Sequence, residues 1–269
     1  MTGVQTCALP ICSWLISGCR SATQVALAAF FLFFAASAMA QTTNGLSDAE
    51  IQGRVLARKI LAQQPASSFT NIATLQIRSP GGGRTNWTAI VQTILTETNW
   101  LNYYDIRPET NDVWRLTIVH KPENFSEYEM SVFGGKSHPK MKLPVPINDW
   151  QMFPWAGSDF SLGDLGLEFF HWPTQKVLKK EIHRSCACTV LESTNPNLST
   201  NGYSRVVSWI DTESLGIVEA YAYDANGKKL KNFYPKDIKK VNGQWQVQTL
   251  VMENLQTGSK SRLEFDLKK

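Results

Sequence analysis

The sequence predicts a mainly β protein whose strands form one long antiparallel meander. Several segments alternate apolar and polar residues with a period of two, hairpin dipeptides separate the later segments, and no strand–helix–strand rhythm of a parallel sheet is present. Such a meander is long enough to curl, and two helical segments are placed where they can cover its concave face. We therefore expect a strongly curved antiparallel sheet with helices over the concave face.

The composition excludes several other classes of protein. The chain has 269 residues, 43% of them hydrophobic and only five of them cysteine, which rules out a disordered chain and a disulfide-stapled miniprotein. Its Lys and Arg residues number 27 and its Asp and Glu residues 23, so the net charge is +4. This charge is far from that of a nucleic-acid-binding protein, and we expect no nucleic-acid partner.

The first forty residues predict a secretory signal peptide. Residues 1–40 carry one charged side chain, Arg20, followed by the apolar run VALAAFFLFFAA at 25–36 and the small residues of Ala38-Met39-Ala40. The apolar run is short for a membrane span, and no stop-transfer charges follow it. We expect cleavage after Ala40, a mature single-domain chain of 41–269, and a periplasmic location.

Two features upstream of that run have another interpretation. Residues 16–19, ending in Cys19, look like a lipobox, but a lipobox has its apolar run before the cysteine and here the run comes after it. Residues 1–11, MTGVQTCALPI, resemble the translated read-through of a sequencing-library adapter. We expect residues 1–11 to be adapter-derived and the true start codon to be lost, so no argument rests on residues before Ser13.

The mature chain retains two cysteines and a net charge of +3, from 26 basic and 23 acidic residues. Cys186 and Cys188 are two residues apart, which places them on one side of a strand at an awkward separation for a disulfide. Two small residues on a strand are the favoured interpretation, and a redox role is the alternative. The four histidines have no ligand spacing, so neither a metal site nor a cofactor is expected.

A helix is expected at the start of the mature chain. Ser47 and Glu50 form an S-x-x-E capping box, and the helix should run to about Gln63. Its apolar residues cover a wide arc rather than a narrow stripe, so this helix should rest on a broad surface such as the opening of a curved sheet: Ile51, Val55, Leu56, Ile60 and Leu61.

Strands should follow from residue 72 onward. Alternation over 72–78, a glycine tip at 81–83, a threonine-rich stretch over 85–104 and alternation over 114–118 indicate antiparallel strands with one buried face. The glycine run is not a phosphate loop, because no Gly-Lys-Ser/Thr and no helix follow it. Residues 121–160 are rich in Pro, Gly, Asn, Met and Trp, and they predict a long irregular excursion.

A second, short helix is expected after this excursion. Ser161 and Asp164 mark its start, and four apolar residues then form a narrow stripe: Leu162, Leu165, Phe169 and Trp172. Gly163 and Gly166 each weaken such a helix by about 1 kcal/mol relative to Ala. The segment is therefore either a moving element or a packed connector.

The C-terminal third predicts six strand-like runs, near 176–192, 203–210, 217–224, 229–240, 244–253 and 259–267. Asn226-Gly227 and Asn242-Gly243 are strong hairpin dipeptides, and Thr257-Gly258 is a weaker one.

No constellation of residues predicts catalysis. His171 and Asp164 are a possible base and orienting carboxylate, yet no nucleophile accompanies them, and a structural role for the histidine is favoured. Asp159 and Asp164 fit a helix cap better than an acid pair for hydrolysis. We expect no catalytic residues and no enzyme activity.

One charged patch stands out in the last third of the chain. Six lysines lie within thirteen consecutive residues: Lys228, Lys229, Lys231, Lys236, Lys239 and Lys240. One interpretation is a docking face that binds an acidic partner or anionic lipid headgroups. The other is a solvated edge strand.

Several motifs together resemble the LolA-like family of outer-membrane lipoprotein-sorting proteins, in a divergent branch. They are Ala156-Gly157-Ser158-Asp159-Phe160-Ser161 with Asp164-Leu165, Phe169-Phe170-His171-Trp172-Pro173, Tyr203 with Trp209-Ile210-Asp211, Tyr223-Asp224 with Gly227-Lys228, and Met252-Glu253-Asn254 with Thr257-Gly258-Ser259. The likeness covers about 46–267.

The resemblance implies an unclosed β-barrel with a helical lid over an apolar cavity, and a monomeric carrier of lipoprotein acyl chains or lipid. Its partners would be an inner-membrane release complex and an outer-membrane acceptor. The resemblance implies that the apolar stripe of the second helix, Leu162, Leu165, Phe169 and Trp172, forms the lid. The alternation of apolar and polar residues, taken by itself, predicts these cavity-wall residues: Trp114, Leu116, Ile118, Trp209, Trp245 and Val247. The alternative is a periplasmic sensor or scaffold of the same fold with a collapsed cavity, acting through protein contacts.

Overall fold

A computed structural model describes residues 46–107, 112–121, 124–134, 140–142, 152–197, 202–241 and 244–267. The predicted signal peptide, residues 1–40, and the predicted Asn242-Gly243 turn lie outside these ranges. In the described part of the chain, no helix is both long and apolar enough to cross a membrane.

The described elements are mostly strands. The strands are β1 (Phe69–Arg78), β2 (Arg84–Leu95), β3 (Trp100–Arg107), β4 (Val113–His120), β5 (Glu127–Phe133), β6 (Lys140–Lys142), β7 (Thr174–His183), β8 (Cys186–Thr194), β9 (Arg205–Asp211), β10 (Ile217–Tyr223), β11 (Lys229–Val241), β12 (Gln244–Asn254) and β13 (Lys260–Phe265). The helices are α1 (Asp48–Leu61) and α2 (Leu162–Leu165), with 3-10 turns η1 (Trp155–Gly157) and η2 (Glu168–His171).

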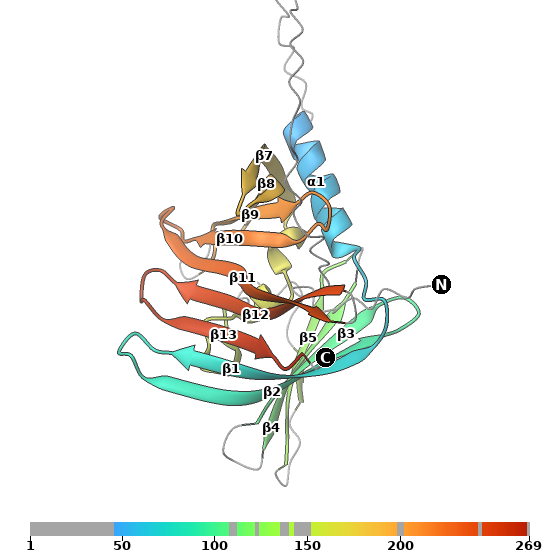
Figure 1. Cartoon of the computed structure of the whole chain (residues 1–269). Helices are drawn as coiled ribbons and strands as arrows, with labels where there is room; N and C mark the ends of the chain where they lie inside the picture. The colour runs from blue at the N-terminus through green and yellow to red at the C-terminus, as the bar shows by residue number, and fades with distance from the viewer. Residues whose placement is uncertain are drawn as a thin grey trace, which may run out of the picture.

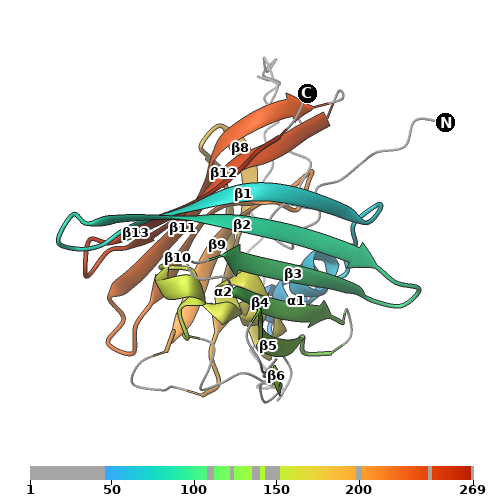
Figure 2. The same ribbon diagram turned by 90° about the horizontal axis from the view of Figure 1, so that it is seen from below.

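These strands form one antiparallel sheet in the order β6-β5-β4-β3-β2-β1-β13-β12-β11-β10-β9-β8-β7. Only the pairing of β1 with β13, for example Ala73 opposite Phe265, joins strands distant in sequence. Among the described strands, β6 and β7 end the sheet without pairing to each other, so the barrel is unclosed. Figures 1 and 2 show the strong curvature, with α2 on the inner side of the curve between β9–β11 and β3–β5. The predicted fold class is confirmed.

Helix α1 begins where its capping box predicts. The Ser47 side chain accepts from the Glu50 N–H, and the Glu50 carboxylate accepts from the Ser47 N–H at 2.8 Å. Its residue Gly53 lies against the backbone of Gln175 and Lys176 on β7, where a Cβ atom would come within 2.5 Å of the Gln175 carbonyl. The missing side chain therefore lets the helix pack directly on the edge strand (Figure 1).

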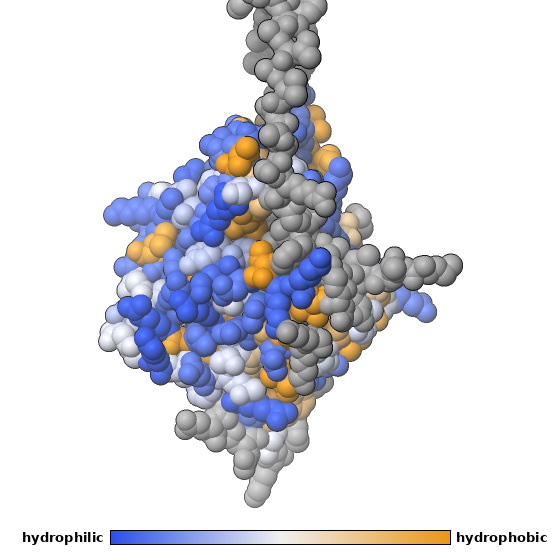
Figure 3. Space-filling view, in the orientation of Figure 1, coloured by the Kyte–Doolittle hydropathy of each residue, from blue (hydrophilic) through white to orange (hydrophobic). Residues whose placement is uncertain are grey.

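The core lies on the concave side of the sheet. Residues that alternate along β1, β2, β3, β4 and β13 point inward and are completely buried, including Leu75, Val91, Tyr104, Ile118 and Leu263. The outer face over β10–β13 carries mostly hydrophilic side chains (Figure 3). This one-sided burial is the physical basis of the period-two pattern in the sequence.

The structure corrects the prediction for residues 121–160. A regular seven-residue strand, β5, lies within this segment and pairs with β4, so the segment is not irregular throughout. The inward residues Tyr128 and Met130 alternate with Glu127 and Glu129, which is a period-two pattern that proline-rich and glycine-rich neighbours obscured.

The predicted run at 176–192 is a hairpin of two strands, β7 and β8, joined by Arg184 and Ser185. Both loop residues have positive φ, 47° and 66°, as the tight turn of a two-residue hairpin requires. Cys186 and Cys188 lie on β8 and are not joined by a disulfide.

Candidate functional site

The segment over residues 152–172, which we call the lid segment, lies against the concave face of the sheet. Its fold differs from the predicted single helix. After the 3-10 turn η1, Ser161 and Asp164 form a capping box, and α2 ends after four residues because Leu167 adopts a left-handed φ of 53°. The predicted amphipathic helix is therefore one helical turn followed by η2.

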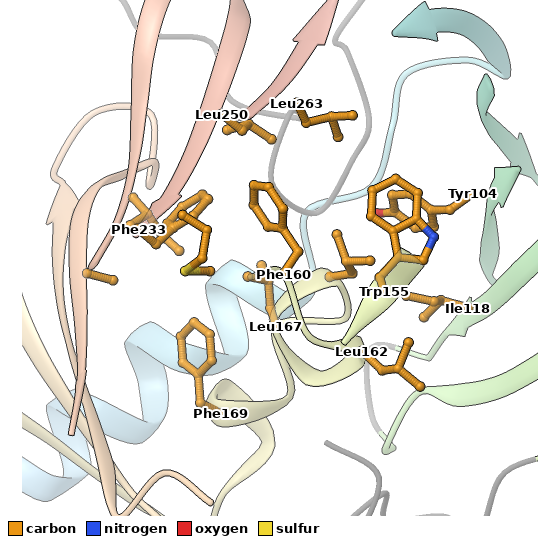
Figure 4. Close-up of a cluster of buried hydrophobic side chains, with 14 of the residues drawn as sticks. Tyr104, Ile118, Trp155, Phe160, Leu162, Leu167, Phe169, Phe233, Leu250 and Leu263 are labelled. Carbon is orange, nitrogen blue, oxygen red and sulfur yellow. The ribbon is translucent and has the colours of Figure 1, made fainter. Parts of the chain in front are cut away.

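The apolar side chains of the lid segment are nevertheless buried as the stripe predicts. Leu162, Leu165, Phe169 and Trp172 are at most 6% exposed. Figure 4 shows Phe160 and Leu167 reaching from the lid segment toward Phe233 and Leu250 of the sheet. These side chains fill the middle of the concave side, and the space left beside Phe169 and Phe233 is a cavity of only about 20 Å³.

A buried polar cluster fixes the lid segment to the half of the sheet formed by β9–β13. The Asp164 carboxylate accepts a hydrogen bond from the Tyr203 hydroxyl at 2.8 Å and lies 3.2 Å from the Lys231 ammonium. The Asp164 and Lys231 side chains are 7% and 8% exposed. Lys231 also donates to the Asp159 carbonyl at 2.7 Å, and Asp164 accepts from the Ser161 N–H and hydroxyl.

Asp159 extends this cluster to strand β13. Its carboxylate accepts from the hydroxyls of Ser259 at 2.5 Å and Ser261 at 2.7 Å, and its N–H donates to the Ser261 hydroxyl oxygen at 2.8 Å. We call this set the polar anchor: Asp159, Asp164, Tyr203, Lys231, Ser259 and Ser261. Burial, followed by the Asp164 charge, raises the pKa of Tyr203, so the phenol stays a neutral donor.

The other side of the lid segment meets β4 and β5 through different contacts. Gly166 lies so close to Tyr128 that a Cβ atom would fall 1.9 Å from the phenol oxygen. Tyr128 donates to Glu168 at 2.9 Å, whereas the second Glu168 oxygen is buried with no partner among the described residues. Gly166 therefore allows the lid segment to pack directly against Tyr128, which favours the packed connector of the two alternatives named from the sequence.

Burial dominates the titration of this region. It raises the pKa of Glu168 to about 7, against the hydrogen bond from Tyr128, which lowers it. It lowers the pKa of His120 to about 3 and that of His171 to about 4. The His171 ring contacts Phe125, and Asp164 belongs to the polar anchor, so these two residues do not form the base and orienting pair considered from the sequence.

A second cavity lies between the lid segment and β3–β5, and we call it the lid cavity. Its volume is about 220 Å³, and apolar side chains supply most of its surface. The apolar lining comes from β3 and β4 (Ile106, Trp114, Leu116), from β5 (Met130, Val132) and from the lid segment (Trp155, Ala156, Leu162). The one charged lining residue, Arg115, is held by Asp105 through two hydrogen bonds of 2.7 Å.

The predicted cavity-wall residues do not lie together. Trp114 and Leu116 line the lid cavity, Trp114 being 51% exposed, and Ile118 is a completely buried core residue. Val247 lines a separate cavity between β10 and β11. The side chain of Trp245 lies outside the described part of the structure.

The prediction that Trp209 lines the cavity wall is wrong. Trp209 points to the outer face, because its neighbours Ser208 and Ile210 occupy the inner face. There its ring stacks on His183, with centroids 4.7 Å apart, and its N–H donates to Glu181 at 2.7 Å.

The six clustered lysines do not form one docking face. Lys231 is buried in the polar anchor, and Lys239 is half-buried and donates to the Leu267 carbonyl at 2.9 Å. Lys228 and Lys229 are exposed at one end of β11, whereas Lys236 and Lys240 are exposed toward the other end. Lys229 and Lys236 are seven positions apart along the strand, which separates the two exposed pairs by roughly 23 Å.

Sequence reasoning missed several residues of this site. The sequence pattern did not indicate Trp155, Met130 or Val132 as lining residues of the lid cavity, because each lies in the segment over 121–160 that was expected to be irregular. Lys231 was assigned to the surface because it lies in a run of lysines. The resemblance motifs did contain Asp159, Asp164, Tyr203 and Ser259, but nothing in their spacing shows that they meet.

The open sheet, the covering helices and the lid segment define an unclosed-barrel fold of the LolA-like class. A solved structure of a DUF1329 family protein from Desulfovibrio piger has this fold, with 17% identity and a TM-score of 0.64 over 82% of this chain and 92% of that chain. A putative outer membrane lipoprotein-sorting protein domain from Vibrio parahaemolyticus is 18% identical, with a TM-score of 0.65 over 81% and 91%.

A LolA superfamily protein from Nitrosomonas europaea is 17% identical, with a TM-score of 0.50 over 83% of this chain and 95% of that chain. A family model described as "uncharacterized protein" matches residues 138–268, a range that contains the lid segment and every residue of the polar anchor. None of the curated proteins compared with the sequence matches it. The chain therefore has the LolA-like fold that its motifs predicted.

Proposed function

We propose that this chain is a non-enzymatic periplasmic carrier, which binds acyl chains of lipoproteins or lipids and moves them toward the outer membrane. The observation that carries the proposal is the lid cavity, an apolar space of about 220 Å³ between the lid segment and β3–β5. Each methylene group that leaves water for such a lining stabilises the bound state by roughly 0.8 kcal/mol. Binding of an acyl chain needs no charged partner in the cavity.

The exposed side of the lid cavity supports the proposal that an acyl chain enters it from solvent. Trp114 lines the cavity and is half-exposed, so apolar surface extends from solvent to the buried residues Leu116 and Leu162. The half-exposed Trp114 ring therefore gives an entering acyl chain an apolar surface that continues into the cavity.

The unequal attachment of the lid segment supports a way to enlarge the cavity. On the β9–β13 side the polar anchor holds Asp159 and Asp164 by several hydrogen bonds. On the β3–β5 side the contacts that border the cavity are mostly apolar, such as Trp155 edge-on to Tyr104. A lid segment that separates from β3–β5 and stays anchored on the other side admits a longer chain.

The cellular part of the proposal comes from the sequence and the resemblance. The predicted signal peptide directs the chain to the periplasm, and a monomeric carrier there would receive cargo from an inner-membrane release complex and deliver it to an outer-membrane acceptor. A protein with a solved structure of the same fold is described as a putative outer membrane lipoprotein-sorting domain.

A second candidate function is a sensor or scaffold that acts through protein contacts. It is favoured by the filling of the concave centre by Phe160, Leu167 and Phe169, which leaves about 20 Å³ beside Phe169. This alternative predicts a stable protein complex and an empty lid cavity.

Native mass spectrometry of the purified protein, followed by titration with a fluorescent fatty acid, tests the carrier proposal. Trp114→Ala removes the aromatic ring from the cavity mouth, and we expect it to weaken binding about tenfold or more. The matched control is Trp209→Ala, since this tryptophan lies on the outer face and should leave binding unchanged.

An apo protein that neither copurifies with acylated species nor binds the fatty acid contradicts the carrier proposal and leaves the scaffold alternative. Equal losses in the two tryptophan variants would mean that general destabilisation, and not the cavity, controls binding. Circular dichroism of each variant separates that case from a specific effect.

A further inference from the structure

The sheet has a lateral opening between β10 and β11. Strand β10 pairs with β11 only as far as Ala220 opposite Phe233, whereas β11 continues to Val241 with β12 as its partner. Pro235 lies where β11 leaves β10, and its missing N–H is tolerated there because no β10 residue is in register with it. A cavity of about 260 Å³ lies in this opening, which we call the window.

The floor of the window is apolar and continuous with the core. Ile217, Phe233, Val247 and Leu250 line it, and each is less than 9% exposed. Figure 4 shows Phe233 and Leu250 within the buried cluster that surrounds the lid segment. Ile238, at the mouth, is 39% exposed and extends the apolar surface to solvent.

Two cations border this floor, Arg184 and Lys236. Arg184 donates through Nη2 to Glu219 at 2.8 Å and stacks over Tyr234, and its guanidinium has five N–H groups, so that donors remain for another acceptor. The Lys236 ammonium lies 3.5 Å from Asp237 in an exposed pair, and such pairs are weak.

The acidic groups at the window are already bound by donors. The Asp211 carboxylate accepts from the N–H and the hydroxyl of Ser214, at 2.8 and 2.6 Å. Glu219 is bound by His183 and Arg184. The lining therefore holds two cations, Arg184 and Lys236, and one carboxylate, Asp211, which is engaged in its own turn. Each cation also pairs with one carboxylate beside the lining, Arg184 with Glu219 and Lys236 with the exposed Asp237.

The backbone at Arg184 supports a role for its side chain. Arg184 and Ser185 form the two-residue loop of the β7–β8 hairpin, and both have positive φ. Asn and Gly are favoured in such loops, and another residue in the left-handed region is unfavourable by roughly 1–2 kcal/mol. Turn preference does not account for an arginine here, but its contacts with Glu219 and Tyr234 do, and these contacts hold the guanidinium at the window rim.

We propose that the window binds a single-chain anionic amphiphile, with its aliphatic chain on the apolar floor and its carboxylate or phosphate between Arg184 and Lys236. The volume is slightly below the range of about 300–1,000 Å³ that is typical of small-molecule sites, so the window holds one chain and not two. The inference goes beyond the proposed carrier function, because the lid cavity has a different opening and a single lining cation, Arg115, which is held by two hydrogen bonds to Asp105, whereas two cations line the window.

Calorimetric titration of the purified protein with three twelve-carbon probes tests the window. Laurate and dodecyl phosphate carry the two anionic heads, and 1-monolaurin carries a neutral one, each used below its micelle concentration. We expect at least one anionic probe to bind about tenfold more tightly than monolaurin. Which anionic probe binds more tightly assigns the head as a carboxylate or a phosphate.

Two variants at solvent-exposed positions test the assignment of the site. Lys236→Gln should weaken the anionic probe about fivefold to tenfold, and Ile238→Glu, which adds a negative charge at the mouth, should weaken it further. Lys228→Gln is the matched control, because this exposed lysine lies at the other end of β11. Unfolding midpoints equal to that of the wild type establish that each variant is folded.

Failure of both anionic probes to bind, equal binding of monolaurin, or wild-type affinity in Lys236→Gln and Ile238→Glu would overturn the inference. If Trp114→Ala alone abolishes binding of the anionic probe, the lid cavity is the site, so the carrier proposal stands and the window proposal fails. Loss in the window variants with normal binding in Trp114→Ala supports the window whatever the lid cavity does.

Discussion

The two sides of the lid segment are attached to the sheet by different physics. Toward β9–β13, Asp159 and Asp164 are held by charged and hydroxyl donors inside the core. Toward β3–β5, the lid segment offers apolar surface, one close glycine contact and a buried carboxyl group, beside a cavity of about 220 Å³.

This difference indicates which side of the lid segment can separate from the sheet. Buried charges require their partners in one geometry, because separating them leaves an unpaired charge in a medium of low dielectric constant. Apolar contacts are not directional, and the same surface can be covered by an acyl chain instead of the lid segment. The polar anchor therefore defines the fixed side, and in the proposed carrier the β3–β5 contacts define the side that opens.

The largest expected effect comes from breaking the polar anchor. Asp164→Ala removes the partner of Lys231, the acceptor of Tyr203 and the carboxylate that accepts from the Ser161 N–H in the capping box of α2, and we expect a loss of about 3–5 kcal/mol in the free energy of unfolding. Urea denaturation monitored by tryptophan fluorescence measures this loss.

Asp237→Ala is the control for this change. Its carboxylate is 48% exposed and, within the described part of the chain, pairs with the exposed Lys236, so the change in stability should stay within about 0.5 kcal/mol. Adding Lys231→Met to Asp164→Ala should recover part of the lost stability, because the unpaired buried ammonium is then also removed. Strictly additive losses would show that Asp164 and Lys231 do not act as a pair.

Much of the fold was predictable from local patterns. The capping box of α1, the alternation in β1, β4 and β13, and the Asn226-Gly227 turn are properties of neighbouring residues, and the structure has each of them. Strand β5 was missed because proline and glycine around it suggested irregular structure. Its own alternation, with Tyr128 and Met130 inward, was present in the sequence.

The site was less predictable, because its residues meet only in the folded sheet. Asp164 and Lys231 are 67 positions apart, and no local pattern links them. Trp209 was assigned to the wrong face because residues 206–210, VVSWI, carry apolar side chains in both phases of the alternation. Trp114 and Leu116 were assigned correctly to the inner face, because only one phase of β4 is apolar there.

A smaller effect is expected from crowding the contact on the β3–β5 side. Gly166→Ala places a methyl group 1.9 Å from the Tyr128 oxygen, so the phenol or the lid segment must shift, and we expect a loss of about 1–3 kcal/mol in stability. Thermal unfolding followed by circular dichroism measures it. Gly81→Ala has open space around its added methyl and should have almost no effect. A neutral Gly166→Ala would show that the lid segment already separates readily from β5.

The smallest effect is a change in pH dependence at Glu168. Because burial raises its pKa to about 7, this carboxyl binds a proton more tightly in the folded protein than in the unfolded chain. Its contribution to stability is therefore complete below about pH 4.5 and is lost as the pH rises through 7. His120 and His171 act in the opposite direction, since their lowered pKa values reduce stability as the pH falls below about 6.5.

Comparison with Glu168→Gln isolates the carboxyl group, because the amide still accepts from Tyr128 and the two histidines remain in each protein. The stability of the wild type relative to this variant should fall by about 2 kcal/mol between pH 5 and pH 8. Exposed Glu264→Gln is the control and should show no such trend. A flat difference would mean that water reaches Glu168 at neutral pH. The β3–β5 side would then be open in the resting protein, and the contrast with the polar anchor would be larger than the packing indicates.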